Sequence, residues 1–600
     1  MPKKKYNAGL KYENPSLFYL LPIAFIISVV PLIVYMKVVE LTPIEIKNWY
    51  GEQYYTDFFS YYKSQWLLAG TVFAVFFFIV YSLVHKFQVK KSFAYIPAIL
   101  YAMMVVLSTV FSDYKEVALR GFVARYEGMY VLLSYVALFL ITFNLVKGER
   151  QIKFLMGALL LCSFVIGLIG VFQFIGLDIF RTGFGKQLLL PKEYENIADS
   201  IQFRFGESNV YATLSNPNFV GSYTALLLPV AFAAFVYLKN TYLKIGAALL
   251  NIILLLCLFG SRSRAGMMGL GVTLLFGLIL FRRYIFKYKM ISLISVIFIV
   301  VSFTGVNHAL DGILIDRIVA EFRQNVDGGV QYFDLQDIVF DNDTVSIISS
   351  SETLAIKNAD NKLYFYDDEG NMLDHTLTEG EASRVTFKDE KYRDYIIDIN
   401  GDVLTVRQKR AEFQLRVGSG GFKLIGINGD ETNNIKKPES VGFAGKERMG
   451  SARAYIWSRT LPMIKDTIIL GNGPDTYAIA FPQYDYIGKI RAYGTPQMIV
   501  DKPHNTYLQI ATNTGLLSLL AFLALCGFYL LQSAKLYIKN VDSSFTCLAG
   551  VGIFLAVCAF LTAALANDSV VAVAPIFWIL LGLGLVCNRL VLANTVKKDL

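Results

Sequence analysis

The chain has 600 residues, of which 55 % are hydrophobic and only 17 % are charged. Soluble domains carry about 25 % charged residues, so this composition excludes an ordinary soluble protein. The formal net charge of +9 does not indicate nucleic-acid binding, because the lysines and arginines gather in short loops between apolar segments, where the positive-inside rule expects them.

A series of apolar segments reaches the roughly 20 residues that a bilayer-spanning helix requires. The first is too long for the apolar part of a signal peptide and lacks a small-residue cleavage site, which predicts a retained anchor. The pattern predicts an all-α polytopic membrane protein with about 12 transmembrane helices. The spans are expected near residues 16–39, 65–86, 93–112, 128–146, 152–175, 218–238, 242–259, 265–281, 288–305, 505–533, 546–566 and 570–591.

The basic residues set the expected orientation. Lys3, Lys4, Lys5 and Lys11 favour an N-terminus in the cytoplasm. Counted from there, every later basic loop falls on the same side of the membrane. We therefore expect both termini in the cytoplasm and the longer, less basic connections on the outer face of the cytoplasmic membrane.

These expectations divide the chain into three parts. Residues 1–305 form an N-terminal transmembrane bundle of about nine helices, and residues 504–600 form a C-terminal bundle of about three. Residues 306–503 contain no apolar run of spanning length, so they are expected to form a large extracytoplasmic loop.

The extracytoplasmic loop combines strand-like and helix-like patterns. Residues about 340–428 alternate apolar and polar side chains around turn signals, which predicts a small β-rich insertion. Within it, Ile396–Gln408 is typical of a hairpin, with an Asn-Gly turn at residues 400–401. Helices are expected at 311–324 and, with an amphipathic pattern, at about 447–464.

The stretch DKPHNTYLQIATNTG, residues 501–515, lies where this polar region ends and an apolar helix begins. Its His504 is one of only four histidines in the chain. Pro503 suits the start of a helix and Asn505 or Thr506 can cap it, so we expect His504 at a helix N-terminus. There the helix dipole favours the neutral imidazole, which can accept a proton. The alternative is an interfacial histidine that only caps the helix.

Two arginines stand between apolar runs at the predicted outer boundary, in the tetrad Ser261-Arg262-Ser263-Arg264. They oppose the positive-inside trend, and charge near hydrocarbon is costly. A guanidinium group pairs its N–H donors with phosphate oxygens, so one interpretation is a diphosphate clamp by Arg262 and Arg264. The other is contact with the phosphates of membrane lipids.

Further polar residues stand at the predicted outer ends of spans. Arg125 and Glu127 precede one span in ALRGFVARYEG, and Asn216 and Asn218 open another in SNPN. An ordinary interfacial loop explains the first pair, and helix capping by Asn216 explains the second. Contact with a substrate is the alternative in both places.

Arg453 begins the amphipathic segment RAYIWSR and lies four residues before Trp457, so the two share one helix face. A cation–π pair on a surface helix is one interpretation. The other is a helix that lies on the membrane and directs Arg453 into a cavity.

The sequence lacks the signature motifs of several enzyme classes. The six cysteines stand singly in apolar runs, which predicts neither a disulfide framework nor a metal site. We find no HExxH motif, no P-loop and no serine elbow. A candidate base and several arginines on one face suit transfer from a donor with a pyrophosphate leaving group, whose charge arginines can neutralise without a metal. No cofactor is expected.

The chain resembles the superfamily of O-antigen ligases and O-antigen polymerases, bacterial enzymes of membrane glycan assembly. The resemblance implies a helical fold of the glycosyltransferase C type and a polyprenyl-diphosphate-linked glycan as donor. It implies functional roles for His504, for Arg453 and for Arg264 or its neighbour Arg262. The matching segments run in order from residue 118 to residue 583 and are ALRGFVARYEGMYVLLSY, IGLIGVFQFIGLD, ATLSNPNFVGSYTALLLP, GSRSRAGMMGL, RAYIWSRTLPMIKDTIILGNGPDTY, HNTYLQIATNTGLLSLLAFL and NDSVVAVAPIFWILLGL.

We therefore predict a metal-independent, inverting glycosyltransferase of the ligase type, whose acceptor is a glycan, a lipid or a protein. His504, Arg453 and Arg264 are the predicted catalytic residues. The predicted contacts to the diphosphate or the glycan come from Arg262, Arg125, Asn216, Asn218 and Asn505.

Three alternatives stay open at this point. A polymerase of lipid-linked repeat units fits the same residues, and the β-rich insertion is longer than a simple ligase needs. A glycan transporter or flippase fits the composition, but it should show charges at midplane depth or broken helices. A sensor would need a cytoplasmic output domain, for which the predicted inner loops are too short.

Overall fold

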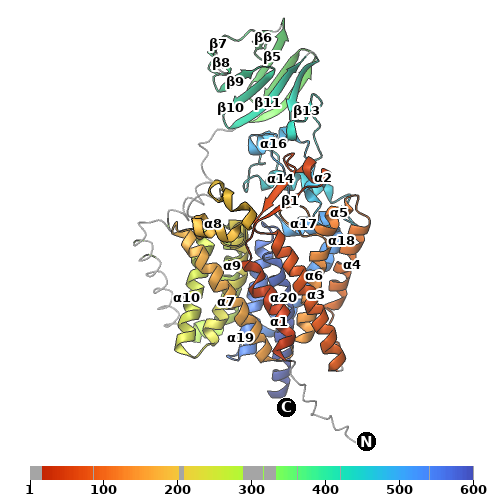
Figure 1. Ribbon diagram of the computed structural model, residues 1–600, viewed down its shortest axis with the longest axis vertical. Coiled ribbons are helices and arrows are strands. Elements are labelled where there is room, and N and C mark those ends of the chain that lie inside the picture. Colours follow the sequence, from red (N-terminus) through yellow and green to blue (C-terminus); the bar gives the residue numbers. More distant parts are fainter. Residues whose placement is uncertain are drawn as a thin grey trace, which may run out of the picture.

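The computed structural model describes residues 16–85, 87–201, 209–287, 304, 308, 315, 333–360, 362–380, 382–418, 420–539 and 541–598. A bundle of long helices forms its lower part and a β-domain its upper part, with short helices between them (Figure 1). We call the end of the bundle that faces the β-domain its upper end.

Eight helices in the described residues are long and apolar enough to cross a membrane, so the chain is a multi-pass membrane protein. They are α3 Tyr61–Val84, α7 Glu149–Phe174, α9 Pro217–Tyr237, α10 Thr241–Gly260, α11 Arg264–Lys287, α18 Leu516–Tyr537, α19 Phe545–Ala563 and α20 Ala574–Lys598. Shorter apolar helical segments are Leu17–Leu32, α4 Tyr95–Val110 and α6 Met129–Leu145. The predicted span near 288–305, the predicted helix 311–324 and the N-terminal lysines fall outside the described residues, save Thr304 and Ile315. The count of twelve spans therefore stays a prediction.

The first predicted span, 16–39, is too long at its C-terminal end. Its helical part consists of η1 Leu17–Leu20, α1 Leu21–Ser28 and η2 Val30–Leu32. Pro31 lacks the N–H that would continue the helix of α1. Beyond it, Lys37–Glu40 form strand β1, which pairs antiparallel with β2, Tyr54–Asp57.

The predicted span 505–533 is two helices, α17 Thr506–Thr514 and α18. They meet at Gly515, whose φ of +101° lies in the left-handed region that favours glycine. The break ends α17 at Thr514 and separates it from the apolar span α18.

Helix α19 is the centre of the bundle. In its apolar 18-residue stretch, 89 % of the residues are buried, whereas only 22 % are buried in the corresponding stretch of α11. It packs against α9, α11 and α20, and small residues bring the backbones close: a Cβ on Gly552 would lie 2.7 Å from Cβ of Ala233 on α9. This packing fixes the upper connection between α19 and α20.

The β-domain is a pair of antiparallel sheets. Their apolar faces share one core, to which Ile487 and Ile490 of the short helix α16 also contribute, so the β-domain is packed onto the helices below it. One sheet contains, in order, β3 Leu335–Asp341, β4 Thr344–Ser349, β5 Thr353–Ala359 and β6 Lys362–Tyr366. The other contains β7 His375–Thr378, β8 Ser383–Phe387, β9 Tyr395–Asn400, β10 Val403–Gln408, β11 Ala411–Gly418, β12 Gly421–Ile425 and β13 Glu431–Thr432.

The predicted β-rich range of about 340–428 is short at both ends, because β3 begins at Leu335 and β13 ends at Thr432. The predicted hairpin between Ile396 and Gln408 is confirmed as β9–β10. Its turn is one residue later than predicted: Asn400 pairs with Val403, which leaves residues 401 and 402 as the turn.

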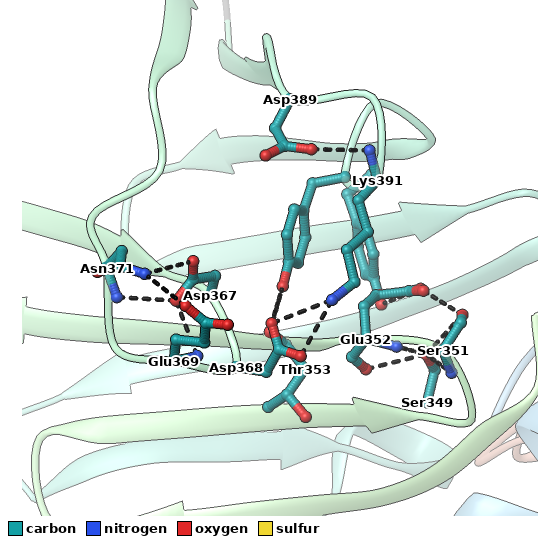
Figure 2. Close-up of polar contacts among 12 residues, drawn as sticks. Ser349, Ser351, Glu352, Thr353, Asp367, Asp368, Glu369, Asn371, Asp389 and Lys391 are labelled. Atoms are coloured by element: carbon teal, nitrogen blue, oxygen red, sulfur yellow. Dashed lines mark hydrogen bonds and ion pairs between the residues drawn. The ribbon is translucent and has the colours of Figure 1, made fainter.

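The turn that follows β6 is held by its own acidic side chains (Figure 2). Asp367 Oδ1 accepts hydrogen bonds from the N–H of Glu369 at 2.9 Å and of Asn371 at 2.8 Å. Asp368 pairs at 3.0 Å with Lys391, which lies between β8 and β9. This contact links the two sheets at the surface.

The connections between the long elements carry short helices. The predicted amphipathic helix of about 447–464 begins only at Arg453, because Ser451 and Ala452 have φ of +59° and +64° and cannot continue a right-handed helix. The short helices are α2 Pro43–Asn48, α5 Lys115–Arg120, η3 Ile179–Arg181, α8 Gly183–Leu189, η4 Lys192–Ser200, η5 Ile427–Gly429, α14 Arg453–Met463, α15 Tyr477–Ala480 and α16 Tyr486–Tyr493.

We expect Gly515→Ala to destabilise the chain by roughly 1–3 kcal/mol, the usual cost of a strained backbone conformation. A Cβ at this φ would also lie 2.4 Å from the carbonyl oxygen of Ile469. Thermal unfolding of the purified chain in detergent measures the effect. Gly527→Ala is the matched control, because a Cβ there meets nothing within 4 Å. Equal melting temperatures for the two variants would contradict the account of the break.

Candidate functional site

The candidate site lies at the N-terminus of α17, where this helix meets α14 and the upper end of the bundle (Figure 1). Helix α17 starts at Thr506 because the Asn505 side chain accepts hydrogen bonds from the N–H of Tyr507 at 2.9 Å and of Leu508 at 3.0 Å. His504 directly precedes this cap, with a φ of +50°. The prediction that His504 stands at a helix N-terminus is confirmed.

His504 has an acidic partner that we did not predict from the sequence. Its Nδ1 lies 3.0 Å from Oδ2 of Asp568, in the connection between α19 and α20. The Asp568 side chain is 1 % exposed and that of His504 is 30 % exposed. Burial alone would raise the pKa of Asp568, but His504, Lys502 and Arg125 lower it to about 2, so the carboxylate is ionised at neutral pH.

A carboxylate at Nδ1 favours the imidazole tautomer that carries its proton there, which leaves Nε2 as the acceptor. The dipole of α17 is therefore not the only electrostatic field that acts on the His504 imidazole. The negative charge of Asp568 opposes its effect and would stabilise an imidazolium that forms by proton uptake.

The residues on either side of Asp568 hold it in place. Asn567 donates its Nδ2–H to the carbonyl of Asn218 at 2.9 Å and to Ser222 Oγ at 2.7 Å, both on α9. Ser569 donates its Oγ–H to Glu127 at 2.8 Å. Three consecutive side chains thus connect α9, His504 and the segment before α6.

Arg453 and Arg264 lie within electrostatic reach of each other, and Arg453 also lies within reach of Asp568. Both arginines are half-buried. Burial lowers the pKa of Arg453, Asp568 raises it, and the nearby positive charge of Arg264 lowers it. The Nε of Arg453 is buried and has no hydrogen-bond partner among the described residues. Arg262, in contrast, is exposed, with a φ of +53°.

Trp457 ties α14 to the segment that carries His504. Its indole Nε1–H donates to the carbonyl of Pro503 at 2.8 Å. This hydrogen bond keeps the start of α14 beside His504. Arg453 and Trp457 were predicted to share one helix face, and Trp457 therefore holds that face near His504.

Arg125 is buried in a network of carboxylates. Its Nε lies 2.7 Å from Oδ1 of Asp475, and both side chains are at most 4 % exposed. Its guanidinium also donates to the carbonyl of Asp501. Asp475 Oδ2 accepts from the N–H of Phe122 at 2.7 Å and of Glu127 at 3.2 Å. These contacts join the segment before α6 to the segments before α15 and before His504. This structural role of Arg125 was not predicted.

The predicted asparagines cap and connect helices. Asn216 Oδ1 accepts from the N–H of Asn218 at 2.9 Å and opens α9, as the capping interpretation expects. Asn505 caps α17 and also donates to the carbonyl of Leu565 at 2.9 Å. Asn218 presents its carbonyl to Asn567. Contact of these three residues with a substrate stays a prediction.

In the part of the chain that the structure describes, no group of three or more His, Cys, Asp or Glu side chains is arranged to hold a metal ion. The side chains at the site are an imidazole oriented by an ionised carboxylate and two arginines beside it.

Comparison with known proteins gives one match. A family model described as O-antigen ligase matches residues 414–523, from β11 through α14 and His504 into α18. Neither the curated proteins nor the solved structures contain a match to the chain. The matched stretch includes Arg453 and His504 and supports the O-antigen ligase superfamily.

Glu127 should make the stability of the chain depend on pH. Burial raises its pKa from 4.5 to about 7, so between these pH values the folded chain binds more protons than the unfolded chain. The free energy of unfolding should fall as the pH rises through this window. We expect Glu127→Gln to flatten that dependence in thermal unfolding of the detergent-purified chain.

The matched control is Glu116→Gln, since Glu116 is exposed on α5, where it pairs with the exposed Arg120 at 3.2 Å. It should keep the slope of the unmodified chain. An unchanged slope in Glu127→Gln would contradict the assignment.

Proposed function

We propose that this chain is a membrane glycosyltransferase of the O-antigen ligase superfamily. It transfers a glycan from a polyprenyl-diphosphate carrier to an acceptor hydroxyl on the outer face of the cytoplasmic membrane, and both of its termini are cytoplasmic. The observation that carries the proposal is the 3.0 Å contact between His504 and buried Asp568, beside Arg453 and Arg264.

The reaction is a direct displacement at the anomeric carbon of the donor sugar. The acceptor oxygen forms the new glycosidic bond while His504 Nε2 accepts its proton. The bond from the anomeric carbon to the diphosphate oxygen breaks, and the leaving diphosphate takes the electron pair. One displacement inverts the configuration and forms no covalent enzyme intermediate. The diphosphate ester is already activated, so no ATP is needed.

Arg453 and Arg264 neutralise the charge that develops on the departing diphosphate. Partial burial strengthens this attraction, because the effective dielectric constant near the protein is lower than that of water. The buried Nε of Arg453 is a donor that a phosphate oxygen could satisfy. Asp568 acts through His504: it orients the ring and stabilises the imidazolium.

A polymerase that joins lipid-linked repeat units would use the same chemistry, with a second lipid-linked unit as acceptor. A transporter is the alternative of another class, and it would require a helix broken within the membrane. The break at Gly515 instead precedes α18, which is a full-length span by itself. Loss of transfer in variants of the catalytic pair separates the transporter from both enzymes.

We expect His504→Ala and Arg453→Ala each to reduce glycan transfer on the order of a hundredfold or more, because each removes a group that acts in the transition state. The measurement is the size of lipid-linked glycan in cells, separated by gel. Accumulated long chains indicate a ligase, and single repeat units indicate a polymerase.

The control for this experiment is His85→Ala, since His85 follows the opposite, lower end of α3. It should give the normal pattern, and all three variants should reach the membrane at normal levels. A normal glycan pattern in His504→Ala would remove this residue from the mechanism and favour the transporter.

Arg264→Lys should lower the transfer rate about tenfold, because lysine keeps the charge but loses the paired donors of guanidinium. Arg262→Lys is the matched control two residues away: Arg262 is exposed, so its rate should stay normal. Transfer rates in isolated membranes decide between them. A normal rate in Arg264→Lys as well would indicate contact with membrane lipids in place of the donor.

A further inference from the structure

A cavity lies beside the candidate site. Its volume is about 330 Å³, within the range of about 300–1,000 Å³ that is typical of small-molecule sites. Its walls include residues 55–60 of the β1–β2 hairpin region and the start of α9. They also include residues 501–502, just before His504, and 570–572, just after Asp568. The two segments that carry the catalytic pair are therefore also a wall of this cavity.

Aromatic rings make up much of the cavity wall. They are Trp49, Tyr55, Phe58, Phe59, Tyr211 and Phe219. Some of them pack edge to face, with ring centroids 5.6 Å apart for Trp49 and Tyr55 and 6.2 Å apart for Phe59 and Tyr211. Polar groups stand among the rings, including Ser215 and Asn216 at the start of α9.

The charges around the cavity are balanced. Tyrosines aside, its ionisable lining residues are Asp57, Arg125, Asp501 and Lys502, two acids and two bases. Asp57 Oδ1 already accepts from the N–H of Ser60 and of Tyr61, each at 2.8 Å. Arg125 is paired with Asp475, and Lys502 Nζ lies 3.7 Å from Asp501.

The arginines of the candidate site, Arg453 and Arg264, do not line this cavity. They lie within electrostatic reach of each other, and Asp568 is the carboxylate that acts on Arg453. A diphosphate gains most from these two arginines, whereas the balanced cavity suits an uncharged ligand. Aromatic rings with interspersed hydrogen-bonding groups fit a sugar, whose C–H faces pack on rings while its hydroxyls bind polar groups.

We propose that this cavity is the acceptor subsite of the transferase and that it binds an uncharged sugar unit of the acceptor. The assignment rests on the proposed function, since it takes His504 as the base that meets the acceptor hydroxyl. The donor diphosphate then binds to Arg453 and Arg264, and the acceptor sugar binds in the cavity. Arg125 and Asn216, for which contact with the diphosphate or the glycan was predicted, both line this cavity.

The test compares two probes on the purified full-length chain by titration calorimetry. One probe is the neutral oligosaccharide fraction released by mild acid from the polyprenyl-linked glycan of the host cells. The other is inorganic pyrophosphate. Tyr55→Leu and Phe219→Leu should each weaken oligosaccharide binding about tenfold, through the loss of one aromatic contact and its buried area, and should leave pyrophosphate binding unchanged.

Tyr54→Leu is the matched control, because Tyr54 is the neighbouring residue on β2, is 56 % exposed, and does not line the cavity. It should bind both probes normally. A second readout needs no substitution: the oligosaccharide, and not pyrophosphate, should protect Trp49 from chemical oxidation followed by mass spectrometry.

Cavity variants that lose pyrophosphate binding in place of oligosaccharide binding would overturn the proposal, since the cavity would then hold the donor. Unprotected Trp49 together with normal oligosaccharide binding in both variants would also overturn it. If His504→Ala keeps full transfer while the cavity variants lose the oligosaccharide, the proposed catalytic pair fails and the sugar site stands.

Discussion

The contact between His504 and Asp568 is the interaction on which the arrangement at the upper end of the bundle depends. The carboxylate is 1 % exposed, and leaving such a charge without its partner typically costs several kcal/mol. The structure avoids this cost by holding both partners through their neighbours. Asn505 caps α17 behind His504, and Asn567 and Ser569 connect both sides of Asp568 to α9 and to Glu127.

Two groups of residues near this pair differ in charge. Arg453 and Arg264 lie within electrostatic reach of each other, and they would attract an anion. They do not line the aromatic cavity, which has as many acidic as basic lining residues. A transferase needs such a difference, because an anionic leaving group and an uncharged acceptor must meet at one reacting centre.

Local rules account for what the sequence could predict. The bilayer demands long apolar helices, so most spans were found from composition and length alone. Caps depend on neighbouring residues, which is why the places of His504, Asn505 and Asn216 were predictable. The break at Gly515 also had a local signal, a glycine in the sequence Asn-Thr-Gly-Leu-Leu, but continuous apolarity on its C-terminal side favoured one helix.

Partners that are distant in the chain were not predictable in this way. Asp568 follows His504 across the whole of α17, α18 and α19, and Asp475 meets Arg125 from another part of the chain. Tertiary packing alone brings these residues together. The one signal available was an acidic residue in the short connection Asn567-Asp568-Ser569 between two apolar helices, where a charge needs a partner.

The most direct test of the account is a double-mutant cycle on the transfer rate with His504→Ala, Asp568→Ala and the double variant. If the carboxylate acts only through the imidazole, the double variant should be no slower than the slower single variant. Independent losses that multiply in the double variant would contradict the claim that the two residues work as one unit.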